Sequence, residues 1–302
     1  MEIAQVDPSL RAATEKAPVL KLENGFNRWM FATLSGLAPG TRIDGVERRI
    51  VRRDARVRVY TPSEASGAGL LWIHGGGLVL GSAAVDDRMC AETALATGAT
   101  VVSVDYRLAP RHPFPTPLED CANGFSWMLR HAAELGIDTD RIAVGGQSAG
   151  GGLAASLVQR LHDEGVSIAA QWLFCPMIDD RTAANRTRDA EGHFVWNNRS
   201  NLVGWRSYLG DRVGAPALPR YAAAARREDL TGLPATWLYS SDIELFFDED
   251  RDYAQRLAEA GVDVTFETIS GAPHGFEAWA PDSDMAVRLV ARARDWLGQR
   301  LG

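Results

Sequence analysis

Short apolar runs alternate along most of the chain with longer amphipathic stretches. The short runs favour β-strands and fall at residues 57–60, 70–73, 100–104, 141–145, 169–174, 235–240 and 264–269. The stretches between them carry apolar residues at helical spacing and predict helices near residues 86–97, 117–135, 149–164, 248–260 and 283–301. Strands that alternate with helices of this length predict an α/β fold, in which helices cover both faces of a mostly parallel sheet.

Two segments depart from this alternation. Residues 176–233 are polar and rich in tryptophan and asparagine, with a helical pattern but no convincing strand. The chain before about residue 40 is also helical in pattern. We therefore expect a single domain over residues 1–302, in which residues 1–40 and 176–233 form a helical cap over the sheet.

Composition narrows the class of protein. With 46% hydrophobic residues, a chain of 302 residues can bury a large core. Its net charge is −7, and its 32 Lys and Arg are scattered among 39 Asp and Glu, so no basic stripe favours a nucleic-acid partner. The apolar runs are too short to predict insertion into a membrane, and the first thirty residues lack the apolar core of a secretion signal.

The cysteine pattern bears on the compartment and on metals. Cys90, Cys121 and Cys175 are widely spaced, odd in number and surrounded by apolar residues, which is typical of reduced, buried thiols. Together with the missing secretion signal, this predicts a cytoplasmic protein. No His/Cys/Asp cluster has the spacing of metal ligands, so we expect neither a metal nor a cofactor.

The strongest chemical signal is the sequence Gly-Gln-Ser-Ala-Gly at residues 146–150. It directly follows the predicted strand 141–145 and opens the predicted helix 149–164. A serine on such a sharp turn is held above the sheet, where it can act as a nucleophile, and the flanking glycines avoid collisions with the neighbouring elements. Ser148 is therefore the candidate nucleophile, and the N–H of Ala149 is a candidate donor to an oxyanion.

A second signal is His-Gly-Gly-Gly at residues 74–77, directly after the predicted strand 70–73. Consecutive glycines suit a loop whose N–H groups must approach a ligand closely. We assign the N–H groups of Gly76 and Gly77 to the oxyanion hole with Ala149. A phosphate loop is disfavoured because no Lys-Ser/Thr pair follows, and His74 is interpreted as a structural hydrogen-bonding residue.

A nucleophilic serine needs a general base, and His274 is the best of six histidines. It lies in a Gly/Pro-rich loop, Gly271–Phe276, just after the last predicted strand. It also follows the serine in the chain, as the order Ser, acid, His of this type of active site requires.

Four motifs in this order resemble the hormone-sensitive-lipase-like family of bacterial esterases. They are His74–Gly77, Asp105–Pro110 with Pro113–Pro115, Gly146–Gly151 and Gly271–Phe276. The resemblance implies the α/β-hydrolase fold, a cap built from the N-terminus and a later insertion, and hydrolysis of short- to medium-chain esters without a cofactor. It also implies structural roles for Asp105 and Arg107.

The acid of the triad is less clear from the sequence. The family usually carries an Asp in a D-x-x-x-D-E stretch, and here residues 242–249 read Asp-Ile-Glu-Leu-Phe-Phe-Asp-Glu. Aligning Asp248 and Glu249 with the final pair places Glu244 in the catalytic position, where a glutamate can orient the imidazole as an aspartate does. Asp242 is the rival. Gln147 and Leu78 are two further departures from the family pattern, and both could alter the pocket.

Three other functions are compatible with a sequence of this kind. A lactone hydrolase or an amidase could employ the same triad, because these motifs define acyl-enzyme chemistry better than the leaving group. Hormone receptors that resemble this family have lost the catalytic histidine, whereas His274 is present here.

The expected partner is a small-molecule ester, and residues 264–301 could mediate a homodimer. Trp196 and Trp205 would either line the substrate pocket or pack the cap against the core.

Overall fold

The computed structural model describes the chain apart from residues 18–21, 26, 28–29, 31–32, 34–39 and 54. The described strands form one eight-stranded sheet in the order β1-β2-β4-β3-β5-β6-β7-β8. Strand β2 is antiparallel to both of its neighbours, β1 and β4. The strands β3, β4, β5, β6, β7 and β8 are parallel to one another. The strands are β1 (Val46–Val51), β2 (Val57–Pro62), β3 (Gly69–Ile73), β4 (Thr100–Val104), β5 (Ile142–Gln147), β6 (Ala170–Phe174), β7 (Ala235–Ser241) and β8 (Val264–Ile269).

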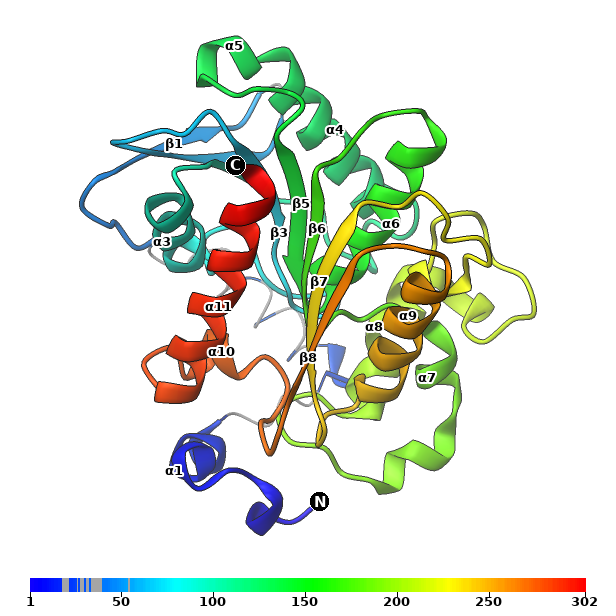
Figure 1. Cartoon of the computed structure of the whole chain (residues 1–302). Coiled ribbons are helices and arrows are strands. Elements are labelled where there is room, and N and C mark those ends of the chain that lie inside the picture. Colours follow the sequence, from blue (N-terminus) through cyan, green and yellow to red (C-terminus); the bar gives the residue numbers. More distant parts are fainter. Residues whose placement is uncertain (18–21, 26, 28–29, 31–32, 34–39, 54) are drawn as a thin grey trace.

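Helices cover both faces of this sheet (Figure 1). Helices α3 and α11 lie on one face, and α4, α6 and α9 lie on the other. The helices are α1 (Pro8–Lys16), α3 (Asp87–Thr97), α4 (Thr116–Arg130), α5 (Ala132–Leu135), α6 (Ala149–Asp163), α7 (Asp180–Ala184), α8 (Asn198–Leu209), α9 (Phe247–Glu259), α10 (Phe276–Trp279) and α11 (Asp284–Leu301). Short 3₁₀ turns are η1 (Ile3–Gln5), η2 (Arg186–Ala190), η3 (Gly210–Arg212) and η4 (Ala224–Arg226).

The two faces of the sheet carry separate hydrophobic cores. Along β3, Leu71 and Ile73 join the core under α4, α6 and α9, whereas Leu70 and Trp72 join the core under α3 and α11. Every residue of this strand is buried. A strand that is covered on both faces needs apolar residues at nearly every position, which explains the continuous apolar runs in the sequence.

The α/β-hydrolase fold with a mostly parallel sheet is confirmed, and the predicted strands and main helices are present. Strand β1 was not predicted. Its sequence, Val-Glu-Arg-Arg-Ile-Val, has no fully buried residue at the edge of the sheet, where charged side chains protect the open hydrogen-bonding groups and hide the alternating pattern. The helix predicted over 117–135 is in fact α4 followed by α5, with a break at His131.

The segment 176–233 has the predicted character. Its described elements are α7, η2, α8, η3 and η4, with no strand among them. At the N-terminus α1 is present, but most of residues 18–39 lie outside the described part, so the cap as a whole stays a prediction. Within the described residues, no helix has both the length and the apolar composition needed to cross a bilayer.

Candidate active site

Ser148 lies at the sharp turn between β5 and α6. It has φ 54° and ψ −121°, a backbone conformation that residues other than glycine rarely adopt. The turn is held by Ser148 N–H, which donates to Phe174 O at 2.8 Å, and by Ser148 O, which accepts from Gly152 N–H and Met177 N–H. These bonds fix the serine at the carboxyl end of β5, as the sequence motif predicts.

The glycines on either side of Ser148 are required by close backbone approach. A Cβ on Gly146 would lie 2.5 Å from Gly150 O and 2.7 Å from Ile73 O. A Cβ on Gly150 would overlap with Ile73 O as well. Any side chain at these positions would therefore push α6 away from β3 and displace the serine.

The glycine loop after β3 runs beside Ser148. A Cβ on Gly75 would lie 3.5 Å from Ser148 Cβ, and Gly76 and Gly77 have φ 116° and 59°. The N–H groups of Gly76, Gly77 and Ala149 donate to no acceptor within the described chain. Backbone donors without an acceptor, on a loop whose first glycine lies beside a buried serine, suit an oxyanion hole.

The structure joins Ser148 and His274, which are far apart in the sequence. His274 Nε2 lies 2.8 Å from Ser148 Oγ, and both side chains are buried. The edge-to-face contact between His274 and Phe246, with ring centroids 5.1 Å apart, and the bond from Trp279 Nε1 to His274 O at 3.0 Å hold the histidine loop in place.

The acid on the other side of the imidazole is Glu244. One of its carboxylate oxygens is hydrogen-bonded to His274 Nδ1. The other oxygen accepts from Ser240 Oγ at 2.7 Å and from Ser241 N–H at 3.1 Å. The glutamate is therefore anchored by the end of β7, and its longer side chain reaches the histidine from the turn after that strand.

Asp242, the rival acid, does not face the imidazole. Strand β7 ends at Ser241, so the alternating orientation that favoured Asp242 does not continue to it. Its carboxylate accepts from Ser270 Oγ and Gly271 N–H, both at 2.8 Å. Asp242 thus supports the base of the loop that carries His274.

A buried polar network beside the triad was missed in the sequence. Gln147 Nε2 donates to Glu277 at 2.7 Å, and Tyr239 OH donates to the second oxygen of Glu277. Burial raises the pKa of the Glu277 carboxyl above its usual range. Gln147, Tyr239 and Glu277 are far apart in the sequence, so no local pattern could have grouped them, although Gln147 stood out as a departure from the family pattern.

Cys175 was also not expected near the site. Its thiol, a carboxylate oxygen of Glu244 and a ring nitrogen of His274 lie within 4.8 Å of one another. These residues come from three different loops, so no spacing rule could group them. Burial raises the pKa of the Cys175 thiol well above its usual value, which keeps it a neutral neighbour of the triad. The expectation that no metal takes part stays a prediction.

His74, Asp105 and Arg107, for which the sequence predicted structural roles, make contacts that fit those roles. The ring of His74 is fully buried, stacks on Tyr106 at 4.2 Å and lies 2.8 Å from Gly75 O. Asp105 pairs with Arg56 at 2.8 Å and accepts from Ala83 N–H, and Arg107 pairs with Asp120. These contacts lie around the glycine loop and at the end of β4.

Comparison with known proteins gives the family. A family model described as alpha/beta hydrolase fold matches residues 70–278. The solved structure of a bacterial heroin esterase is 36% identical, covers 99% of both chains and superposes with a TM-score of 0.91. A solved esterase from the bacterial hormone-sensitive lipase family is 29% identical over 98% of this chain and 99% of that one, with a TM-score of 0.80. The chain belongs to the hormone-sensitive-lipase-like α/β hydrolases.

This membership covers nearly the whole chain. An ethyl acetate hydrolase of Pseudomonas putida is 31% identical over 280 residues, which is 88% of this chain and 87% of that protein. For this hormone-sensitive-lipase-like hydrolase, the sequence predicted departures from the family pattern at Glu244 and Gln147. Both side chains take part in the hydrogen bonds at the active site.

Proposed function

We propose that the protein hydrolyses short- to medium-chain carboxylic esters through an acyl-enzyme formed on Ser148. The observation that carries this proposal is the buried hydrogen-bond chain from Ser148 Oγ through His274 to Glu244. It is supported by the backbone N–H groups of Gly76, Gly77 and Ala149, which donate to no acceptor among the described residues. Nucleophile, base, orienting acid and oxyanion donors are the parts that acyl transfer requires.

In the first step, Ser148 Oγ attacks the ester carbonyl while its proton passes to His274 Nε2. Glu244 holds the imidazole in the required tautomer through Nδ1 and stabilises the imidazolium that forms. The carbonyl oxygen becomes an oxyanion and accepts from the N–H groups of Gly76, Gly77 and Ala149. Each such donor contributes a factor on the order of 10²–10³ in rate.

The tetrahedral intermediate then collapses. The bond to the alcohol oxygen breaks, and His274 returns the proton to the departing alcohol. In the second step water attacks the acyl-enzyme, with His274 again accepting a proton, and the carboxylic acid is released. The cycle restores Ser148 and consumes one water molecule for each ester.

We also propose that residues 1–40 and 176–233 cap the site and limit the length of the acyl group. Trp196 lies directly over Gly77, where a Cβ would overlap with its indole ring. Next to Ala149 is a cavity of about 10 Å³, lined by Leu78, Met177, Trp205 and Tyr208 among others. This volume holds about one water molecule, which supports a preference for short acyl chains.

Replacing Trp205 with alanine should therefore shift the chain-length preference. The lost indole enlarges the cavity beside Ala149, so kcat/KM for p-nitrophenyl octanoate relative to acetate should rise by roughly tenfold or more. Trp296→Ala is the matched control, because it removes the same side chain from α11, on the other face of the sheet. An unchanged ratio in Trp205→Ala would show that Trp205 packs the cap without limiting the acyl group.

A covalent label tests the proposed function directly. Diethyl p-nitrophenyl phosphate should release one p-nitrophenol per enzyme and leave a diethylphosphoryl group on Ser148, detected by peptide mass spectrometry. Labelling at another residue, or none, would contradict the acyl-enzyme mechanism. Lactones and anilides tested on the same preparation distinguish ester hydrolysis from the lactonase and amidase alternatives.

Location and assembly stay predictions. The three cysteines are buried and unpaired, which supports a reducing, cytoplasmic environment. A homodimer would use β8 and α11, which form one edge of the sheet and its adjacent helix.

A further inference from the structure

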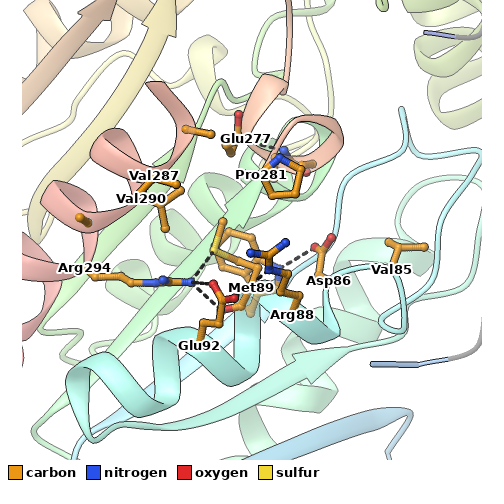
Figure 2. A pocket seen from close by; sticks show the side chains of 15 residues that line it. Val85, Asp86, Arg88, Met89, Glu92, Glu277, Pro281, Val287, Val290 and Arg294 are labelled. Carbon is orange, nitrogen blue, oxygen red and sulfur yellow. Dashed lines mark hydrogen bonds and ion pairs between the residues drawn. The ribbon is translucent and has the colours of Figure 1, made fainter. Parts of the chain in front are cut away.

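A pocket of about 320 Å³ opens between α3, α10 and α11, on the face of the sheet opposite α6. Figure 2 shows Arg88, Met89 and Glu92 on the side of α3, facing Val287, Val290 and Arg294 on the side of α11. The volume falls at the lower end of the range for small-molecule sites. Neither Ser148 nor His274 lines this pocket.

The inner end of the pocket holds two carboxylates, those of Asp86 and Glu277. Asp86 directly precedes α3, yet its side chain does not cap that helix. One of its oxygens accepts from Trp72 Nε1 at 2.7 Å, while the other accepts nothing from the described residues, although the residue is only 8% exposed. This second oxygen is open to the pocket rather than sealed from solvent, so a ligand that can donate a hydrogen bond has access to it.

No positive side chain of the described chain neutralises these two carboxylates. Arg88 pairs with Glu92 at 2.7 Å and with Asp282 at 2.8 Å. Arg294 pairs with Glu92 at 3.1 Å. The arginines near the mouth are thus already matched by acids, and the two oxygens of Glu277 accept from Gln147 and Tyr239. Asp86 is therefore left without a compensating cation among the described residues.

The outer part of the pocket is apolar. Met89, Pro281, Val287 and Val290 line it, and Val287 is 54% exposed. An apolar wall that leads to a buried negative end matches a ligand with one positive group on a compact apolar body.

We propose that this pocket is a second binding site, which takes a protonated amine on a compact apolar body. The ammonium group occupies the inner end, where it donates to the free oxygen of Asp86 and faces Glu277. The apolar body lies against Met89, Val287 and Val290. Gln147 forms part of the wall and separates the amine from the serine turn.

The unliganded site should reduce the stability of the fold, which gives a first test. Burial, with Glu277 and Asp87 nearby, raises the pKa of Asp86 to about 6. Between pH 4 and 6 the folded chain then binds more protons at Asp86 than the unfolded chain does, so this residue lowers the stability increasingly as pH rises. The charged neighbours Arg88, Glu92 and Arg294 are unchanged in Asp86→Asn, which keeps an acceptor for Trp72.

Asp86→Asn should therefore have a higher Tm than the wild type at pH 7.5, by several degrees, and a smaller advantage at pH 4.5. Differential scanning calorimetry at the two pH values measures this difference. Asp282→Asn removes an acid that is 82% exposed and pairs with Arg88 of the pocket lining, and it should show no such increase. A Tm advantage of Asp86→Asn that does not grow with pH would contradict an ionised, uncompensated Asp86.

Binding is tested with benzylammonium chloride and with benzyl alcohol, its neutral counterpart, by isothermal titration calorimetry at pH 7.5. The wild type should bind benzylammonium saturably and benzyl alcohol at least about tenfold more weakly. Asp86→Asn should lose at least about tenfold in affinity for the cation, whereas Asp282→Asn should stay within about twofold of the wild type. Equal affinities for cation and alcohol, or for wild type and Asp86→Asn, would overturn the proposal.

A third experiment tests whether the amine binds in a pocket of its own or in the ester site, as the amino group of a substrate would. Enzyme that carries a diethylphosphoryl group on Ser148 should bind benzylammonium as tightly as free enzyme, because Gln147 lies between the two sites. Loss of binding on phosphorylation would place the amine in the ester site and overturn a separate pocket. The comparison with Asp86→Asn needs no hydrolysis, so its result does not depend on the proposed esterase activity.

Discussion

Replacement of Ser148 by alanine is expected to abolish ester hydrolysis while leaving the fold intact. The alanine removes the only atom that can form the acyl-enzyme in the proposed mechanism, and loss of such a nucleophile costs on the order of 10⁴–10⁶ in kcat. The expected wild-type profile is activity on p-nitrophenyl acetate and butyrate, less on octanoate and little on palmitate. Both proteins are assayed in EDTA, so that a metal-dependent contaminant contributes nothing.

The control for this experiment is Ser103→Ala, which removes the hydroxyl of a buried serine on β4, within the sheet. It should keep nearly full activity, and circular dichroism should show the same fold for both variants. Activity that survives in Ser148→Ala would contradict the proposed nucleophile. Absence of activity on every ester in the wild type would instead direct attention to lactones and amides.

The sequence predicted those parts of the fold and site that follow from local pattern. The parallel strands β3 to β7 are almost entirely buried, so their apolar runs stand out in the sequence. The turn that holds Ser148 is also recognisable, because two backbones pass too close for any Cβ at Gly146 and Gly150. His274 was recognisable for a similar reason, since its loop directly follows the last strand of the sheet.

The parts that were missed depend on packing between distant segments. Strand β1 is exposed and charged, so its pairing with β2 leaves no hydrophobic pattern. The contacts of Cys175 and of the pair Gln147–Glu277 form only when the ends of β5, β6 and β7 and the start of α10 come together. A buried polar network has no period along the chain, and only the folded arrangement reveals it.

Substitution of Glu244 by glutamine is expected to reduce kcat by a factor on the order of 10⁴ with KM nearly unchanged. A carboxylate accepts from His274 Nδ1–H and stabilises the imidazolium, whereas an amide is neutral and can present a donor that favours the wrong tautomer. Ser240 Oγ and Ser241 N–H hold the other oxygen and can still bind an amide oxygen, so the variant should fold. Steady-state kinetics on p-nitrophenyl butyrate and the Tm measure both expectations.

Asp242→Asn provides the matched comparison, because it makes the same chemical change two residues away. Asp242 bonds to Ser270 and Gly271, so its loss weakens the support of the histidine loop without removing charge from the imidazole. A hydrogen bond of this kind contributes about 1 kcal/mol, which predicts a loss of less than about tenfold in kcat. If Asp242→Asn lost more activity than Glu244→Gln, the acid would be assigned to Asp242, and the Glu244 contact would be a structural one. The two variants thus decide between carboxylates that the sequence alone left as rivals.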